Sequence, residues 1–173
     1  MSLTFDTFTP RQTMEDGLFE CHHYLDRVPP QVEYHEHEFY EIFFFLSGDV
    51  SYIIEGSTYK LRPGDILLTS NEDIHKPEVR AGKPYERYVI WIHPDAIQAF
   101  HKLGDDLAAC FLDASDRRFK LIRPDSGTVT QLKSLCEKII QARKDTGFAK
   151  ETLAYLYPVS YTHLRAHETL RHL

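Results

Sequence analysis

Short apolar runs separated by turn residues fill the chain from residue 18 to residue 92. Runs rich in β-branched, aromatic and other apolar residues predict strands at 18–24, 32–35, 40–46, 50–55, 58–61, 65–69, 74–79 and 85–92. In the run 50–55, Val50, Tyr52 and Ile54 are alternate residues and therefore share one face of the strand. Many short strands with frequent glycine and proline turns are typical of a mainly β barrel or sandwich.

The pattern changes at His93-Pro94, after which apolar residues recur at the spacing of a helix and no longer at that of a strand. Proline suits the first position of a helix, so we expect one helix at 95–103 that ends at Gly104, followed by a second at 105–112. Residues 113–124 are charged and are expected to be irregular. Thr128-Val-Thr-Gln131 has the spacing of a capping box and predicts the start of an amphipathic helix that ends at Gly147, with another helix at 148–157.

One apolar stripe runs along the helix that begins at Thr128. Its members are Val129, Leu132, Leu135, Cys136, Ile139 and Ile140. The stripe fits two alternatives, which are packing onto the chain's own barrel and a short coiled-coil-like contact with a second copy. For the second alternative, the expected interface residues of a homodimer are Leu132, Leu135, Ile139 and Ile140.

Composition and charge narrow the class of protein. A chain of 173 residues with 42% hydrophobic and 27% charged residues is an ordinary globular domain. Its net charge of −6 does not favour direct nucleic-acid binding, and three separated cysteines do not form a disulfide framework. The longest purely apolar run, 42–46, is too short to span a bilayer, and no secretory signal is visible. We therefore expect a cytoplasmic protein without membrane contact.

The last 16 residues, 158–173, do not have the character of a natural protein sequence. Residues 159–169 resemble the translation of a sequencing-library adapter that runs on from a truncated gene, so residues 158–173 are expected to be a non-native tail. The expected organisation is then an N-terminal arm at 1–17, a β-barrel at 18–93, a truncated helical dimerisation and linker region at 94–157, and the tail. The tail histidines are excluded from any site.

The candidate chemistry centres on His35-Glu-His-Glu-Phe-Tyr-Glu41 and on His75. His35 and His37 are two residues apart, so they point to one face of a strand. Imidazoles combined with a carboxylate suit Zn²⁺, Ni²⁺, Fe²⁺ or Mn²⁺, which makes His35, His37, Glu41 and His75 possible metal ligands. The alternative is that these side chains bond to one another or to a sugar without any metal.

The stretch 85–93 is the second candidate. Arg87, Val89 and Trp91 share one face, and Tyr88, Ile90 and Ile92 share the other. Arg87 either clamps a ligand or pairs with Glu86 or Glu41. Trp91 either stacks on a sugar or packs against the helix expected at 95–103.

Together these motifs resemble those of the cupin superfamily, and in their order they resemble the N-terminal effector-binding domain of AraC/XylS-type transcription regulators. The resemblance is carried by His35-x-His-x-Phe-Tyr-Glu-Ile42, Gly48, Tyr59-x-Leu-x-Pro-Gly-Asp-Ile-Leu-Leu68, Asp73-Ile-His75 and 85–94, and covers about residues 17–157. It implies a double-stranded β-helix (jelly-roll) barrel followed by helices, with no required cofactor and no enzymatic activity.

The resemblance also implies a function. Such regulators bind a small effector, often a sugar, in the barrel, and dimerise through the helices that follow. Their C-terminal helix-turn-helix units enter DNA, and the present chain has no room for these units, so it is expected not to contact nucleic acid itself. The residues expected to bind the effector are His35, His37, Glu41, Tyr52, His75, Arg87 and Trp91.

Two rival functions remain open. A stand-alone, metal-dependent cupin enzyme, such as an isomerase or dioxygenase, would use the same histidines and glutamate. A purely structural cupin would have a barrel interior filled by Phe43, Phe45 and Tyr52.

Overall fold

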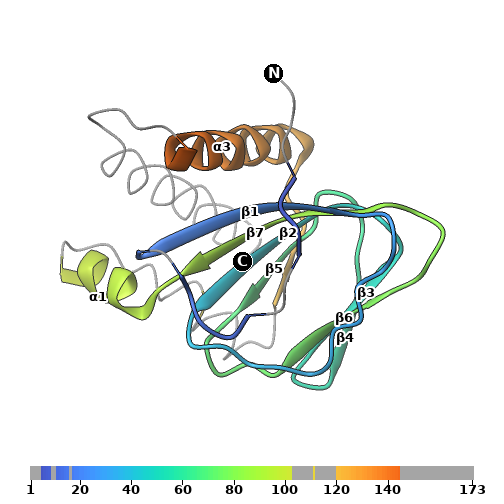
Figure 1. Cartoon of the computed structure of the whole chain (residues 1–173), viewed down its shortest axis with the longest axis horizontal. Coiled ribbons are helices and arrows are strands. Elements are labelled where there is room, and N and C mark those ends of the chain that lie inside the picture. Colours follow the sequence, from blue (N-terminus) through green and yellow to red (C-terminus); the bar gives the residue numbers. More distant parts are fainter. Residues whose placement is uncertain (1–4, 9–10, 16, 103–110, 112–119, 145–173) are drawn as a thin grey trace.

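The computed structural model describes residues 5–8, 11–15, 17–102, 111 and 120–144 (Figure 1). In chain order the elements are β1 (Phe19–Asp26), β2 (Tyr40–Ser47), β3 (Val50–Ile54), β4 (Ser57–Lys60), β5 (Ile66–Thr69), β6 (His75–Val79), β7 (Tyr85–Ile92), α1 (Pro94–Lys102), β8 (Leu121–Ile122) and α3 (Ser126–Lys144). The prediction of a mainly β fold followed by helix is confirmed.

Seven of the eight predicted strands are present, and the strand predicted at 32–35 is wrong. In that segment only His35 pairs, in an isolated antiparallel bridge with His75. Glu33 and Tyr34 are exposed, so the segment lacks the buried face that stabilises a strand.

The strands form two antiparallel sheets. The larger has the order β1-β7-β2-β5-β8, and the smaller has the order β4-β3-β6. In the larger sheet β7 pairs with β1 and β2 along nearly its whole length, so that Trp91 lies opposite Glu20 on one side and Glu41 on the other. These two pairings place the motifs at 35–41 and 85–92 side by side.

The larger sheet is buried on both faces, which explains the unbroken apolar run of β2. Ile42 and Phe44 face one hydrophobic cluster, which also contains residues of α1 and α3. Phe43 and Phe45 face a second cluster, which lies between the sheets and also contains Tyr52 of β3. Accordingly α3 lies along the face of the larger sheet that points away from the smaller sheet (Figure 1).

The turn between β4 and β5 requires glycine. Gly64 has φ +95°, and a Cβ atom there would lie 3.0 Å from Cγ2 of Val129. The backbone N–H of Asp65 donates to the carbonyl of Arg62 at 2.9 Å, and the Asp65 carboxylate accepts the N–H of Arg62 at 2.8 Å. This turn also packs against α3.

The two described helices differ from their predictions at their first residues. Helix α1 begins at Pro94 itself, one residue before the expected start. Helix α3 begins at Ser126, so the capping box predicted at Thr128 is wrong. The cap is Asp125, whose Oδ1 accepts the N–H groups of Gly127 and Thr128 at 2.8 and 2.9 Å.

The apolar stripe of α3 packs on the chain's own sheet. Leu132, Leu135, Cys136 and Ile139 are buried, and Sγ of Cys21 on β1 lies 4.0 Å from the carbonyl of Cys136. Ile140 is half-buried. Of the two alternatives for the stripe, packing onto the barrel is therefore present, and the dimer interface stays a prediction.

Part of the segment predicted to be irregular is a strand. Leu121 and Ile122 form β8, which pairs with Leu67 and Ile66 of β5 and closes one edge of the larger sheet. The helix expected at 105–112, apart from Phe111, lies outside the described residues, as do Gly104, Gly147, the helix at 148–157 and the tail at 158–173. None of the described helices has the length and apolar character needed to cross a membrane.

The cap of α3 gives a direct test of where this helix begins. We expect Asp125→Ala to lower the free energy of unfolding in urea by about 1 kcal/mol, because two backbone N–H groups lose their acceptor. Asp125→Asn, which keeps an acceptor, serves as the control. A larger loss for Thr128→Ala than for Asp125→Ala would contradict this assignment.

Candidate functional site

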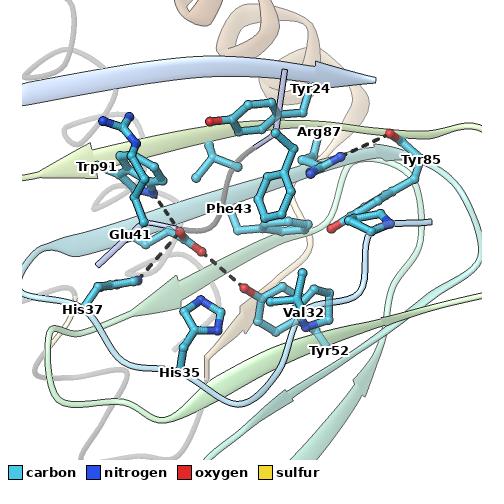
Figure 2. A pocket seen from close by; sticks show the side chains of 15 residues that line it. Tyr24, Val32, His35, His37, Glu41, Phe43, Tyr52, Tyr85, Arg87 and Trp91 are labelled. Carbon is cyan, nitrogen blue, oxygen red and sulfur yellow. Dashed lines mark hydrogen bonds and ion pairs between the residues drawn. The ribbon is translucent and has the colours of Figure 1, made fainter. Parts of the chain in front are cut away.

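A pocket opens between the two sheets, inside the barrel (Figure 2). It holds about 490 Å³ of empty space when its open mouth is counted. The residues that line it are Phe8, Arg11, Tyr24, Pro30, Val32, His35, His37, Glu41, Phe43, Tyr52, Pro77, Tyr85, Arg87, Val89 and Trp91. Phe43 and Tyr52 form walls of this pocket, whereas Phe45 is fully buried beside it.

Three of the predicted residues form one compact group at the base of the pocket. One nitrogen of His37, one nitrogen of His75 and one oxygen of Glu41 lie within 4.8 Å of one another. Nε2 of His37 is 3.8 Å from Oε2 of Glu41. His75 is fully buried and does not line the pocket, so it reaches the group from behind.

Glu41 is the centre of this group, and each of its oxygens accepts a hydrogen bond. Nε1 of Trp91 donates to Oε2 at 2.8 Å, and the hydroxyl of Tyr52 donates to Oε1 at 3.3 Å (Figure 2). Trp91 belongs to the larger sheet and Tyr52 to the smaller one. The carboxylate is therefore held from both sheets.

Burial determines the charge of the group. Removal from water lowers the pKa of His75 to about 4 and also lowers the pKa of His37. Burial acts to raise the pKa of Glu41, but the neighbouring His37 and His75 and the bond from Trp91 outweigh it, so this pKa is lowered. At neutral pH the group therefore consists of two neutral imidazoles and one carboxylate.

The group fits the donor set of a divalent metal ion. Nδ1 of His75 lies 2.8 Å from the carbonyl of Asp73, which can only accept, so Nδ1 carries the proton and Nε2 offers a lone pair. Nε2 of His75 and both ring nitrogens of His37 are buried without a hydrogen-bond partner among the described residues. Two imidazoles and a carboxylate are ligands that Zn²⁺, Fe²⁺, Ni²⁺ and Mn²⁺ accept.

His35, the fourth predicted ligand, is not part of this compact group in the described structure. It is half-buried at the pocket wall, and its Nδ1 lies 2.9 Å from the carbonyl of Glu33. Its ring centre is 4.4 Å from that of His75, because the two residues pair as a β-bridge.

Arg87 lines the other end of the pocket, and its partners are not those that the sequence suggested. Its guanidinium pairs with Asp26 of β1 and donates to the carbonyl of Tyr85 at 3.4 Å. It also lies over the ring of Tyr85, 4.0 Å from the ring centre. No pairing of Arg87 with Glu86 or Glu41 occurs within the described residues.

Trp91 faces the pocket and not the helix. It belongs to the cluster between the sheets, whereas Ala96 and Ile97 of α1 belong to the cluster on the other face of the larger sheet. The alternative in which Trp91 packs against α1 is therefore wrong. Its indole is buried but borders the pocket, with the ring of Phe39 4.6 Å away.

The N-terminal segment supplies two pocket residues that the sequence did not reveal. Phe8 lines the pocket beside Tyr24, with ring centres 5.4 Å apart. Arg11 lies 4.7 Å from the ring centre of Trp91 and is held by Glu20 of β1 at 2.6 Å. These residues stand in a polar segment without periodicity, so no local signal pointed to them.

The burial of His75 leads to a prediction about pH. In the unfolded chain His75 binds a proton near pH 6.5, but in the folded chain it stays neutral down to about pH 4. Between these values the unfolded state binds more protons, so acidification should remove up to roughly 3 kcal/mol of stability. Measured by urea unfolding, the free energy of unfolding should fall less steeply with decreasing pH for His75→Gln than for the wild type. An equal dependence on pH in the two proteins would contradict the prediction.

The chain was compared with curated proteins, solved structures and protein families. No curated protein matches the chain. Among solved structures, the chain is similar to a cupin protein from Bacteroides fragilis (20% identity, 45% of this chain and 68% of the other covered, TM-score 0.40). It is also similar to a cupin 2 conserved barrel domain protein from Salinispora arenicola (20% identity, 50% of this chain and 72% of the other covered, TM-score 0.40). A third similar structure is a cupin superfamily protein from Desulfitobacterium hafniense (14% identity, 46% of this chain and 72% of the other covered, TM-score 0.41).

The family comparison is more extensive than these structural matches. The AraC-like ligand binding domain family matches residues 23–157. This range includes every strand from β2 to β8 and both described helices. It also includes all the residues that line the pocket except Phe8 and Arg11. The chain belongs to the family of AraC-like ligand binding domains.

Proposed function

We propose that this chain is the effector-sensing domain of an AraC-like transcription regulator and that it binds a small, sugar-like molecule in the pocket between the sheets. The observation that carries the proposal is the pocket itself, in which aromatic walls surround a few buried polar groups. Rings can stack on the apolar face of a sugar, and Glu41 and His37 can bond to hydroxyl groups. This is the usual composition of a small-molecule site.

The wider role follows from the family and is part of the proposal. A sensor of this kind works in the cytoplasm and acts without catalysis. Dimerisation also stays a prediction. Because Leu132, Leu135 and Ile139 are buried against the larger sheet, a second copy would have to contact α3 mainly through other side chains.

A thermal-shift screen of sugars and sugar derivatives tests the proposal. A ligand that binds the folded state raises the melting temperature, and the stabilisation grows with the logarithm of the ratio of ligand concentration to dissociation constant. For any such ligand, Tyr52→Phe should weaken binding by about 1 kcal/mol, because the pocket loses a hydroxyl that also holds Glu41. Tyr34→Phe is the matched control, since Tyr34 is exposed outside the pocket. Equal effects of the two variants would contradict binding in this pocket.

A metal-dependent enzyme is the second candidate, and the group of His37, Glu41 and His75 favours it. A divalent ion held there would act as a Lewis acid on a bound substrate. The protein's own contribution would be to fix the His75 tautomer through Asp73 and to hold Glu41 in place through Trp91.

Elemental analysis of the purified protein separates the two candidates. A sensor should contain much less than one metal ion per chain, and its ligand response should survive a chelator. About one ion per chain that is lost in His37→Ala, together with turnover of a substrate, would favour the enzyme.

A further inference from the structure

The charges that face the pocket do not balance. Glu41 is the one carboxylate among the described residues that line it, and its side chain is 8% exposed. No lysine or arginine of the described residues forms an ion pair with it. Both of its oxygens accept hydrogen bonds from neutral donors, which add no positive charge. A buried carboxylate without a counter-charge is unfavourable.

The two arginines that line the pocket already form ion pairs with other carboxylates. Arg87 pairs with Asp26, and Arg11 lies 2.6 Å from Glu20 and 3.0 Å from Glu15. Each guanidinium also lies over an aromatic ring, which fixes its position. Neither arginine is therefore left over for Glu41 or for an anionic ligand.

The hydrogen-bonding capacity that remains beside Glu41 consists of two imidazole lone pairs and one N–H, because a neutral His37 has one of each. Nε2 of His75 offers a lone pair, because Nδ1 bonds to the carbonyl of Asp73. Both nitrogens of His37 lack partners among the described residues, and its ring stacks on Phe39 with centres 3.9 Å apart. A ligand with several N–H donors and a positive charge can bond to the two lone pairs and to Glu41 and can also balance the charge of the carboxylate.

We infer that the effector carries a protonated primary amine, as in an amino sugar, and that this group binds at Glu41 and His37 with His75 behind them. The inference rests on the proposed function, since it names the chemical class of the effector in the same pocket. An ammonium group supplies three donors and one positive charge. The rings of Trp91 and Tyr52 at the same end of the pocket add a favourable cation–π environment.

The spacing of the group lies between the values expected for an ammonium ion and for a metal ion. Around an ammonium nitrogen with donor–acceptor distances of about 2.9 Å, tetrahedrally placed acceptors lie about 4.7 Å apart. Around zinc with bonds of about 2.1 Å, the ligand atoms lie roughly 3.4 Å apart. The described ligand atoms lie within 4.8 Å of one another, and the separation of His37 Nε2 from Glu41 Oε2 is 3.8 Å, so either ion requires a small shift of the side chains and the test uses protein freed of metal.

The smallest amine gives the sharpest test, because it does not depend on the rest of the effector. The melting temperature of the full chain, freed of metal by a chelator, is measured at neutral pH in methylammonium chloride, tetramethylammonium chloride and sodium chloride at equal ionic strength. Methylammonium has both charge and donors, tetramethylammonium has charge alone, and sodium controls for salt. We expect methylammonium to raise the melting temperature by a few degrees more than either control.

A matched pair of sugars and one pair of variants complete the test. Glucosamine should bind at least about tenfold more tightly than glucose, which differs only in the amino group. Glu41→Gln keeps the size of the side chain and removes its charge, so it should abolish the preference for amines. Glu36→Gln removes an exposed charge from the same segment and should keep the preference.

The outcomes separate the inference from the proposed function. Equal effects of methylammonium and tetramethylammonium, or an unchanged amine effect in Glu41→Gln, would overturn the inference. If glucose or another neutral sugar binds at least as well as glucosamine in the pocket, the inference fails and the sensor function stands. If no compound of any class binds, both fail.

Discussion

The buried carboxylate of Glu41 is the interaction on which the site depends. A charged group inside a barrel is tolerated only when hydrogen bonds replace the water it has lost. Here those bonds come from Trp91 on the larger sheet and Tyr52 on the smaller one. Because the donors belong to different sheets, the carboxylate fixes the distance between the sheets at the base of the pocket. It also fixes the place where the two histidines converge.

Most of the strands could be predicted from the sequence, because each depends on local alternation and on turn residues. The face of most strand residues also followed, since side chains on a regular strand alternate. Thus Arg87, Val89 and Trp91 lie on the inner side of β7, and Tyr88, Ile90 and Ile92 lie on the outer side. His37 and Glu41 were recognisable because their residue types and spacing resemble a cupin motif.

Other features depended on contacts between distant residues, which no local pattern reports. Asp26 pairs with Arg87 only because β1 and β7 are neighbours, although the two residues are 61 positions apart. Strand β8 exists because the edge of β5 is available to pair with two residues of a charged segment. The start of α3 was missed for a different reason. Asp125 and Thr128 can both cap a helix, and the sequence does not indicate which of them does.

The same dependence on distant contacts decides which groups the pocket can offer to a ligand. Trp91 donates to Glu41 on one side, while its ring lies against Arg11 of the N-terminal segment and His22 of β1. Arg11 is in turn held by Glu20, also on β1. The indole is therefore held by Glu41, Arg11 and His22, while it still borders the pocket. In the proposed sensor, a rigid aromatic wall beside a single buried carboxylate would select an effector by charge and by shape together.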